Sequence, residues 1–293
     1  MSTSRKTAVI TGGNSGVGFE TAKVLARDGW RVVITGRDAK KLETAAKKIK
    51  LVADNGKGGE VAVRIGDYAS FESVRALAAE LNKEPKIDVL LNCVGISLNT
   101  RKVSRDGNDM MLQVNHLSHF LLTHLLLEKI KASAPARIIN VSSRLHRQTR
   151  SYGFEDFQFE HTFSTLGAYG RTKLYNLLFT FELAKRLKGT GVTVNAMHPG
   201  VLATNIGDFE GILAFIWWLS KFFQKPQILA SKVPVFLATS PRLEGVSGKY
   251  YATGLHQITP SRLARNEQAA QRLWTMSAEL TGLDPKTGQP VSP

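Results

Sequence analysis

The stretch Thr7-Ala-Val-Ile-Thr-Gly-Gly-Asn-Ser-Gly-Val-Gly18 decides the fold of this chain. Its first five residues are a β-branched, apolar run that indicates a buried strand. Glycines follow at once, and residues 19–28 have the pattern of a helix that ends at Gly29. A strand, a glycine turn and a helix place backbone N–H groups and a helix N-terminus where they can hold a phosphate. The spacing is Gly-x-x-x-Gly-x-Gly, not the more common Gly-x-Gly-x-x-Gly, so the loop alone does not identify the ligand.

Strand and helix patterns alternate from this loop to about residue 200. Strands are predicted over 31–35, 60–65, 87–91, 137–141 and 193–197, and helices over 71–81, 110–130 and 166–187. The strands are continuous apolar runs, as expected when helices cover both faces of a sheet. We therefore predict an α/β chain: one Rossmann-like domain over 1–283 with a doubly wound parallel sheet, and a flexible, proline-rich tail over 284–293.

Ligands of such sheets bind outside the carboxyl ends of the strands. The end of the second strand meets the adenosine ribose, where an acid binds a 2′-hydroxyl and an arginine accommodates a 2′-phosphate. Arg37 comes first here, with Lys41 nearby, so we predict NADP(H), and we expect Asp38 to cap the next helix. The alternative is that Arg37 is merely exposed. At the third and fourth strand ends, Asp67 could accept from the adenine amino group, and Gly95 would let the nicotinamide ribose lie close to the backbone.

Tyr169 and Lys173 lie four residues apart in the helix predicted over 166–187, and this spacing puts them on one face. An ammonium near a phenol favours the phenolate, so we expect a lowered tyrosine pKa and a general acid/base for a carbonyl oxygen. The alternative is an ordinary surface pair, because the spacing occurs by chance in many helices.

Together these motifs resemble the short-chain dehydrogenase/reductase family. The resemblance rests on Thr11-Gly12-x-x-x-Gly16-x-Gly18, Asn92-x-x-Gly95, Asn115, Ser142, Tyr169-x-x-x-Lys173 and Pro199-Gly200-x-x-x-Thr204. Longer strings around Asn115, Ser142 and His198, and others in the last fifty or so residues, resemble the retinol dehydrogenase branch with its WW-domain oxidoreductase relatives. The chain departs from the usual Asn-Asn-Ala-Gly of the family at Cys93-Val94. Many vertebrate retinol dehydrogenases carry an N-terminal membrane helix, and we expect none in this chain.

The resemblance implies a role for each motif. Tyr169 would pass a proton to the substrate oxygen as hydride arrives, Lys173 would bind the nicotinamide ribose, Ser142 would bind the substrate oxygen, and Asn115 would hold a water linked to Lys173. The implied cofactor-binding residues are Gly12, Asn14, Ser15, Gly16, Val17, Gly18, Arg37, Lys41, Asp67, Asn92, Gly95, Tyr169, Lys173, Pro199, Gly200 and Thr204. The substrate would be a small hydrophobic carbonyl or alcohol, retinal-like, steroid-like or otherwise lipid-derived. The alternative function is a catalytically weak NADP(H) sensor that acts through a partner protein or a membrane surface.

An apolar, aromatic stretch over 212–223 follows the sixth strand, where the family places a substrate lid (about 202–225). It is too short to span a bilayer. Three interpretations stay open: a helix that lines a lipophilic pocket, peripheral membrane contact through 212–225, or an oligomer contact or ordinary core. The family commonly forms homodimers or homotetramers, and both stay open for this chain.

Composition narrows the function further. The 293 residues carry a net charge of +15, much of it on lysines near residues 40–57, which are interpreted as the solvent face of a helix. No motif supports nucleic-acid binding. One cysteine and scattered histidines predict neither disulfide nor metal site. The N-terminus has no signal-peptide pattern, so we expect a cytoplasmic protein, with the peripheral membrane contact left open, and not a secreted one.

Overall fold

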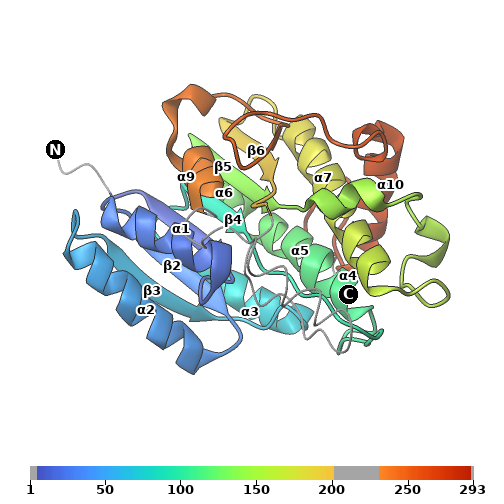
Figure 1. Cartoon of the computed structure of the whole chain (residues 1–293), viewed down its shortest axis with the longest axis horizontal. Helices are drawn as coiled ribbons and strands as arrows, with labels where there is room; N and C mark the ends of the chain where they lie inside the picture. The colour runs from blue at the N-terminus through green and yellow to red at the C-terminus, as the bar shows by residue number, and fades with distance from the viewer. Residues whose placement is uncertain (1–4, 201–230, 292–293) are drawn as a thin grey trace.

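The computed structural model describes residues 5–200 and 231–291, which form a seven-stranded sheet with helices on both faces (Figure 1). The strands are β1 (Thr7–Thr11), β2 (Arg31–Gly36), β3 (Glu60–Ile65), β4 (Val89–Asn92), β5 (Ala136–Val141), β6 (Val192–Met197) and β7 (Tyr250–Tyr251). The longer helices are α1 (Gly16–Arg27), α2 (Ala39–Asp54), α3 (Phe71–Leu81), α5 (Ser118–Leu125), α7 (Thr165–Arg186), α9 (Lys232–Thr239) and α10 (Glu267–Leu280); α4 (Met110–Leu112) and α6 (Leu127–Ala132) are short.

All strand pairs are parallel, in the order β3-β2-β1-β4-β5-β6-β7. The order reverses direction at β1, which lies between β2 and β4. A doubly wound sheet opens a crevice at such a switch point. The predicted fold class is therefore confirmed, and the glycine loop after β1 stands at the switch point.

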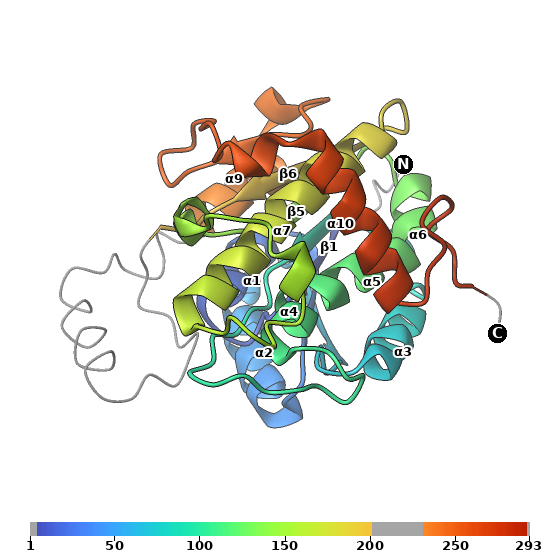
Figure 2. The same ribbon diagram turned by 90° about the vertical axis from the view of Figure 1, so that its right-hand side faces the viewer.

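Alternate side chains of each strand enter different cores. Ala8 and Ile10 of β1 pack under α1, α2 and α9, whereas Val9 packs under α3, α5, α7 and α10. Figures 1 and 2 show these two helical layers on opposite sides of the sheet. Both faces are thus buried, which is why the strands read as unbroken apolar runs.

One predicted helix is wrong, and one strand was not predicted. The single helix predicted over 110–130 is divided into α4, a π-helical turn Gln113–Leu117, α5 and α6. The sequence also gave no indication of β7, because two residues are too few for a periodic pattern. Tyr250 and Tyr251 add this strand to the edge of the sheet by pairing with Ala196 and Met197 of β6.

The tail predicted to be flexible makes several contacts up to residue 291. Asp284 N–H donates to Gln289 O (2.8 Å), and the Trp274 indole N–H of α10 donates to Pro285 O (2.9 Å). Leu283 and Pro290 also form an antiparallel bridge. The structure therefore packs this segment against α10.

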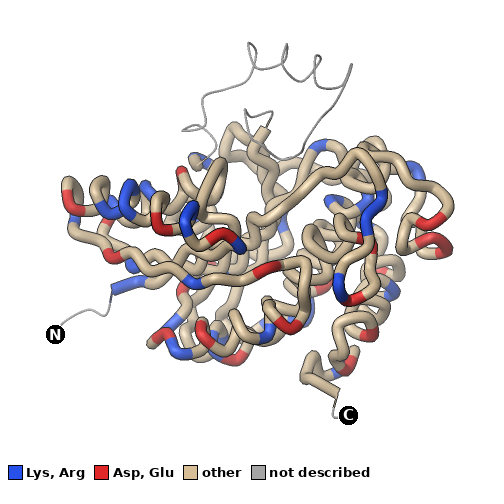
Figure 3. Tube along the Cα trace, turned by 90° about the horizontal axis from the view of Figure 1, so that it is seen from below, with Lys and Arg blue, Asp and Glu red and all other residues tan. Residues whose placement is uncertain are grey.

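Positive charge is spread over the surface and interleaved with acids (Figure 3). The lysines of α2 are exposed, while Leu42, Ala45, Ile49 and Ala53 of the same helix are buried. They therefore form the solvent face of an amphipathic helix. Within the described ranges, no helix is both long and apolar enough to cross a bilayer, and no group of three or more His, Cys, Asp or Glu side chains could hold a metal.

Candidate active site

The glycine loop between β1 and α1 is shaped by close backbone approaches. Gly12 has φ +68°, a conformation that favours glycine. A Cβ on Gly18 would lie 2.6 Å from Gly12 O, and one on Gly13 would lie 2.5 Å from the Ile34 side chain. The N–H groups of Gly12 and Gly13 both donate to Thr35 O of β2 (2.9 and 3.2 Å). The loop is thus held tightly against the end of β2.

The N-cap residue of α1 is Ser15, and its side chain forms no hydrogen bond to the first N–H groups of the helix. The side chains of Asp38, Ser70, Ser164 and Asn266 cap α2, α3, α7 and α10 instead. The first N–H groups of α1 therefore stay available. With the glycine loop they fit the pyrophosphate of a dinucleotide.

Charged side chains of Arg37, Asp38 and Lys41 follow the end of β2. Asp38 accepts from Lys41 N–H (3.0 Å) and caps α2, as predicted. Lys41 Nζ also lies 3.7 Å from the Asp38 carboxylate. Arg37 is exposed, and within residues 5–200 and 231–291 its side chain forms no hydrogen bond or ion pair. Its guanidinium is therefore the group at this strand end that is best placed for a phosphate.

The predicted residues after β3 and β4 differ in what they present. Asp67 accepts from Ala69 N–H (3.0 Å) and shapes the turn before α3. Asn92 is fully buried and donates to Thr123 (3.0 Å) and Asn140 (2.9 Å). The structure thus corrects the assignment of the Asn92 side chain to the cofactor: it holds β4 against β5 inside the core.

Gly95, Asn115 and Lys173 meet at the edge of the sheet. A Cβ on Gly95 would lie 3.2 Å from Lys173 Nζ and 3.5 Å from Asn115 Oδ1. Asn115 accepts from Ile96 N–H (2.7 Å) and donates to Ile96 O (2.9 Å). The π-helical turn turns Asn115 toward this strand end, in keeping with the frequent occurrence of such turns at functional sites.

Tyr169 and Lys173 lie together on α7, as their spacing predicts. Lys173 is 2% exposed, and its Nζ lies 5.4 Å from the centroid of the Tyr169 ring. The same Nζ donates to Val141 O at the end of β5 (3.3 Å). Lys173 is therefore buried and Tyr169 half-buried at the ligand-binding edge, which excludes the surface-pair interpretation.

The expected lowering of the tyrosine pKa is wrong for this structure. Burial raises the pKa of Tyr169 above its ordinary value of 10, although the Ser143 side chain hydrogen-bonds the phenol and opposes the rise. Burial also lowers the pKa of Lys173 to about 8. Loss of hydration disfavours both charged forms, and at the phenol it outweighs the opposing hydrogen bond from Ser143.

The serine assignment also changes. Ser142 is 1% exposed, and its hydroxyl donates to the main-chain carbonyl of Lys173 (2.8 Å). Ser143 is half-buried and hydrogen-bonds the Tyr169 phenol. The structure thus places Ser143, and not Ser142, beside the phenol.

The remaining predicted positions follow β6. Pro199 and Gly200 are half-buried, and Gly200 N–H donates to His198 Nδ1 (3.1 Å). Thr204, the lid over 202–225 and the stretch 212–225 lie outside the described residues. Two cavities lie beside β6 and β7, and Tyr169 is not among the described residues that line them.

A comparison with protein families matches residues 6–210 to the short chain dehydrogenase model. The chain belongs to the short-chain dehydrogenase family. It is therefore an oxidoreductase that transfers hydride with a nicotinamide cofactor.

Curated short-chain dehydrogenases of the retinol branch resemble the chain along most of its length. It is 44% identical to mouse retinol dehydrogenase 12 and 42% identical to human retinol dehydrogenase 13. Each alignment covers 95% of this chain, with 87% of the mouse protein and 85% of the human one. The predicted relation to this branch is confirmed.

Solved structures of the family share the fold. An uncharacterized protein from Mycobacterium paratuberculosis is 31% identical, with a TM-score of 0.76 over 95% of this chain and 94% of that one. A Beutenbergia cavernae structure, described as an NAD(P)-dependent gluconate 5-dehydrogenase with bound NADP, is 26% identical, with a TM-score of 0.68 over 85% and 94% of the two chains.

Sequence reasoning missed Ser143 at this short-chain dehydrogenase site. Neighbouring residues at a strand end point to opposite sides, so one of two adjacent serines faces the core and the other the ligand edge. Which of the two serines faces the ligand edge depends on where the strand ends, and β5 ends at Val141. The alternation of inward and outward side chains along β5 is therefore the feature of the sequence that could distinguish Ser142 from Ser143.

Proposed function

We propose that the chain is an NADP(H)-dependent oxidoreductase that moves a hydride between nicotinamide and the carbonyl or alcohol carbon of a hydrophobic substrate. Tyr169 would act as its general acid and base. The observation that supports this most is the meeting of Tyr169, Lys173 and Ser143 at one sheet edge. A half-buried phenol that keeps its proton at neutral pH suits the donation step of carbonyl reduction.

Each side chain has a separate task in this proposal. The bound cofactor supplies or accepts the hydride. Tyr169 gives its proton to the carbonyl oxygen in reduction and removes one from the alcohol in oxidation. The Ser143 hydroxyl donates to the same oxygen as negative charge develops there. Lys173, held by Val141 O near the ring, stabilises the phenolate that remains.

In this proposal, the residues that follow β2 determine the preference for NADP(H) over NAD(H). Arg37 would pair with the 2′-phosphate of NADP(H), because its guanidinium has no hydrogen-bond or ion-pair partner among the described residues and matches phosphate geometry. Lys41 is already near Asp38 and would add less. The uncapped α1 N-terminus would take the pyrophosphate, and Asp67 and Gly95 would lie along the adenine and nicotinamide ends.

The hydrophobic substrate class rests on the relatives called retinol dehydrogenases. We therefore include retinal-like, steroid-like and other lipid-derived carbonyls among the candidates. The lid assigned to 202–225 would complete the pocket, and peripheral membrane contact through 212–225 would deliver a lipid substrate.

The test is NADPH oxidation by the purified full chain across a panel of aldehydes and ketones, with NADH alongside. Tyr169→Phe should lower kcat by about 10²–10⁴-fold while NADPH fluorescence titration still shows binding. Tyr152→Phe, whose hydroxyl donates to Leu263 O, is the matched control and should keep turnover.

Wild-type activity in Tyr169→Phe would contradict the catalytic assignment. Tight NADPH binding by the wild-type chain with no turnover of any carbonyl would favour the sensor function instead.

A further inference from the structure

A cavity of about 860 Å³ opens beside the ends of β6 and β7, next to the turn that follows Ser143. Its lining includes four arginines, Arg144, Arg147, Arg262 and Arg265, and no aspartate or glutamate among the described residues. They come from two segments far apart in the chain, the 3-10 turn Arg144–Gln148 and the loop before α10. The fold thus gathers positive charge at one hollow of the catalytic edge.

These arginines have no acidic partners in the part of the chain that the structure describes. None of the four forms a salt bridge within residues 5–200 and 231–291. Arg147 donates to the main-chain carbonyl of Thr259, which ties the two segments together without neutralising the charge. Like charges held together repel each other, so a counter-charge in the cavity would stabilise this arrangement.

The cavity wall is built onto the catalytic site. His146 is fully buried, and its Nδ1 donates to Ser143 O (2.6 Å) while its Nε2 accepts from Ser261 N–H (3.2 Å). One imidazole therefore joins the main chain of Ser143 to the loop that carries Arg262 and Arg265. A group bound in the cavity would stand at a fixed position relative to the Tyr169 phenol.

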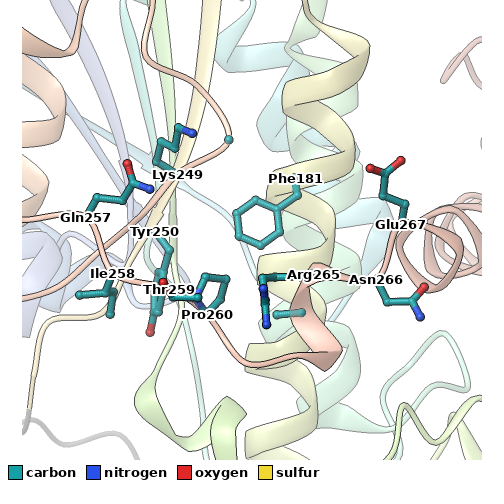
Figure 4. A pocket seen from close by; sticks show the side chains of 12 residues that line it. Phe181, Lys249, Tyr250, Gln257, Ile258, Thr259, Pro260, Arg265, Asn266 and Glu267 are labelled. Carbon is teal, nitrogen blue, oxygen red and sulfur yellow. The ribbon is translucent and has the colours of Figure 1, made fainter.

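The positive charge of the arginines acts on two buried side chains, His198 and Tyr250. Burial and then the charges of Arg144, His146 and Arg147 lower the pKa of His198 to about 4. Tyr250 is 1% exposed, and its hydroxyl has no hydrogen-bond partner in the described structure, although Arg144 and Arg147 act on it electrostatically. Figure 4 shows Tyr250 beside the neighbouring hollow, which it lines together with Arg265 and Phe181.

We propose that the arginine cavity binds an oxyanion group, a carboxylate or a phosphate, carried by the substrate whose carbonyl or alcohol reacts at Tyr169. Guanidinium groups recognise both anions through paired N–H donors. The substrate is then amphipathic: its hydrophobic part lies at the catalytic edge and its anionic end lies among the arginines. This inference rests on the proposed reductase function and narrows its substrate class.

The first experiment compares a medium-chain ω-oxo carboxylate with its methyl ester, using NADPH oxidation by the full chain. The two aldehydes differ only in the charge at the far end. The acid should have a kcat/KM at least about tenfold higher at low salt, and the preference should shrink as salt rises. In the Arg144→Gln/Arg265→Gln double variant, the ratio of acid to ester should fall to about one.

A matched control carries the same loss of charge elsewhere. Lys188→Gln/Arg242→Gln removes two exposed cations that do not line the cavity, and it should keep the wild-type ratio. Equal kcat/KM for acid and ester in the wild type, or the same loss in both double variants, would overturn the proposal. The proposal would also be overturned if NADPH affinity fell in Arg144→Gln/Arg265→Gln by as large a factor as the acid-to-ester ratio. That result would assign these arginines to the cofactor.

Direct binding separates this inference from the proposed function. If the chain reduces neither these aldehydes nor any carbonyl of the panel, the reductase proposal fails, and the cavity is tested by calorimetry with inorganic phosphate and with a medium-chain dicarboxylate. Saturable binding of either anion, at least about fivefold weaker in Arg144→Gln/Arg265→Gln, would support the site and identify its anion. No saturable binding, or unchanged binding in that variant, would overturn it.

Discussion

The hydroxyl of Ser142 donates a hydrogen bond to the main-chain carbonyl of Lys173, 2.8 Å away, and so joins the end of β5 to α7. The bond is buried and engages the backbone of a predicted catalytic residue. It fixes α7 where Tyr169 can meet Ser143. The two adjacent serines therefore divide the work: one positions the helix and the other contacts the phenol.

Exchanging each serine for alanine should separate these tasks. Ser143→Ala should lower kcat by about 10²-fold, because it removes a donor to the developing oxyanion. Ser142→Ala should keep kcat within about threefold but lower the free energy of unfolding by about 0.5–1.5 kcal/mol, because it removes one buried hydrogen bond to a carbonyl of α7. Steady-state kinetics and urea unfolding of both variants check this. Collapse of kcat in Ser142→Ala, with normal turnover in Ser143→Ala, would restore the assignment made from sequence.

Removing the cation after β2 should change cofactor preference. Arg37→Ala should raise KM for NADPH by roughly 10–100-fold and leave KM for NADH nearly unchanged, because only NADPH carries the 2′-phosphate. Lys40→Ala, an exposed lysine one turn away, is the control and should have little effect. Equal effects of Arg37→Ala on the two cofactors, or a wild-type preference for NADH, would rule out this role.

Carbonyl reduction should weaken as pH rises through about 8. Burial lowers the pKa of Lys173 to about 8, so its ammonium dominates at pH 7 and is largely lost by pH 9. Loss of this charge removes support for the phenolate that forms at Tyr169. We expect kcat/KM for reduction to fall along this limb, and Lys173→Met to be nearly inactive throughout. A flat wild-type profile from pH 6.5 to 9.5 would contradict a titrating Lys173.

Burial of His124 in α5 should make the fold sensitive to acid. Burial lowers the pKa of His124 to about 4, and its ring packs 4.2 Å from Phe120 and 4.8 Å from Trp274, measured between centroids. Because the unfolded chain protonates this group near pH 6.5, stability is lost as pH falls from about 6.5 through about 4. The loss attributable to His124 is about 3 kcal/mol by pH 4.

His124→Phe should remove that share of the acid sensitivity, as measured by chemical unfolding at pH 7 and pH 4. Exposed His161→Phe is the control and should leave the slope of stability against pH as in the wild type. If His124→Phe loses as much stability as the wild type on acidification, its burial does not drive the effect.

The fold could be predicted because its signals are local. Apolar runs mark β1 to β6, and glycine follows the first strand directly. β7 could not be found, because two residues carry no periodicity and the strand exists only through pairing with β6. The break in the helix at Gln113 was hidden for a similar reason: its cause is the contact of Asn115 with Ile96, which no local pattern records.

Predictions of the site were right where spacing alone fixes geometry. Tyr169 and Lys173 are one helical turn apart, so their meeting follows from the helix. The pKa of Tyr169 did not follow, because it depends on how much water the rest of the fold excludes. Asn92 turned inward and Ser142 bonded to α7 for the same reason, since tertiary packing decides which of two neighbouring polar groups meets solvent.

The π-helical turn Gln113–Leu117 constrains the length of the chain there as well as its shape. Deleting one residue from it would favour a regular α-helix and rotate the preceding segment by about 100° relative to α5. Asn115 would lose both bonds to Ile96, and Gln113 would lose its contacts with Ser104 and Asn108. Substitutions are thus easier to accommodate at this point than any insertion or deletion, and alignments of working homologues should run through it without a gap.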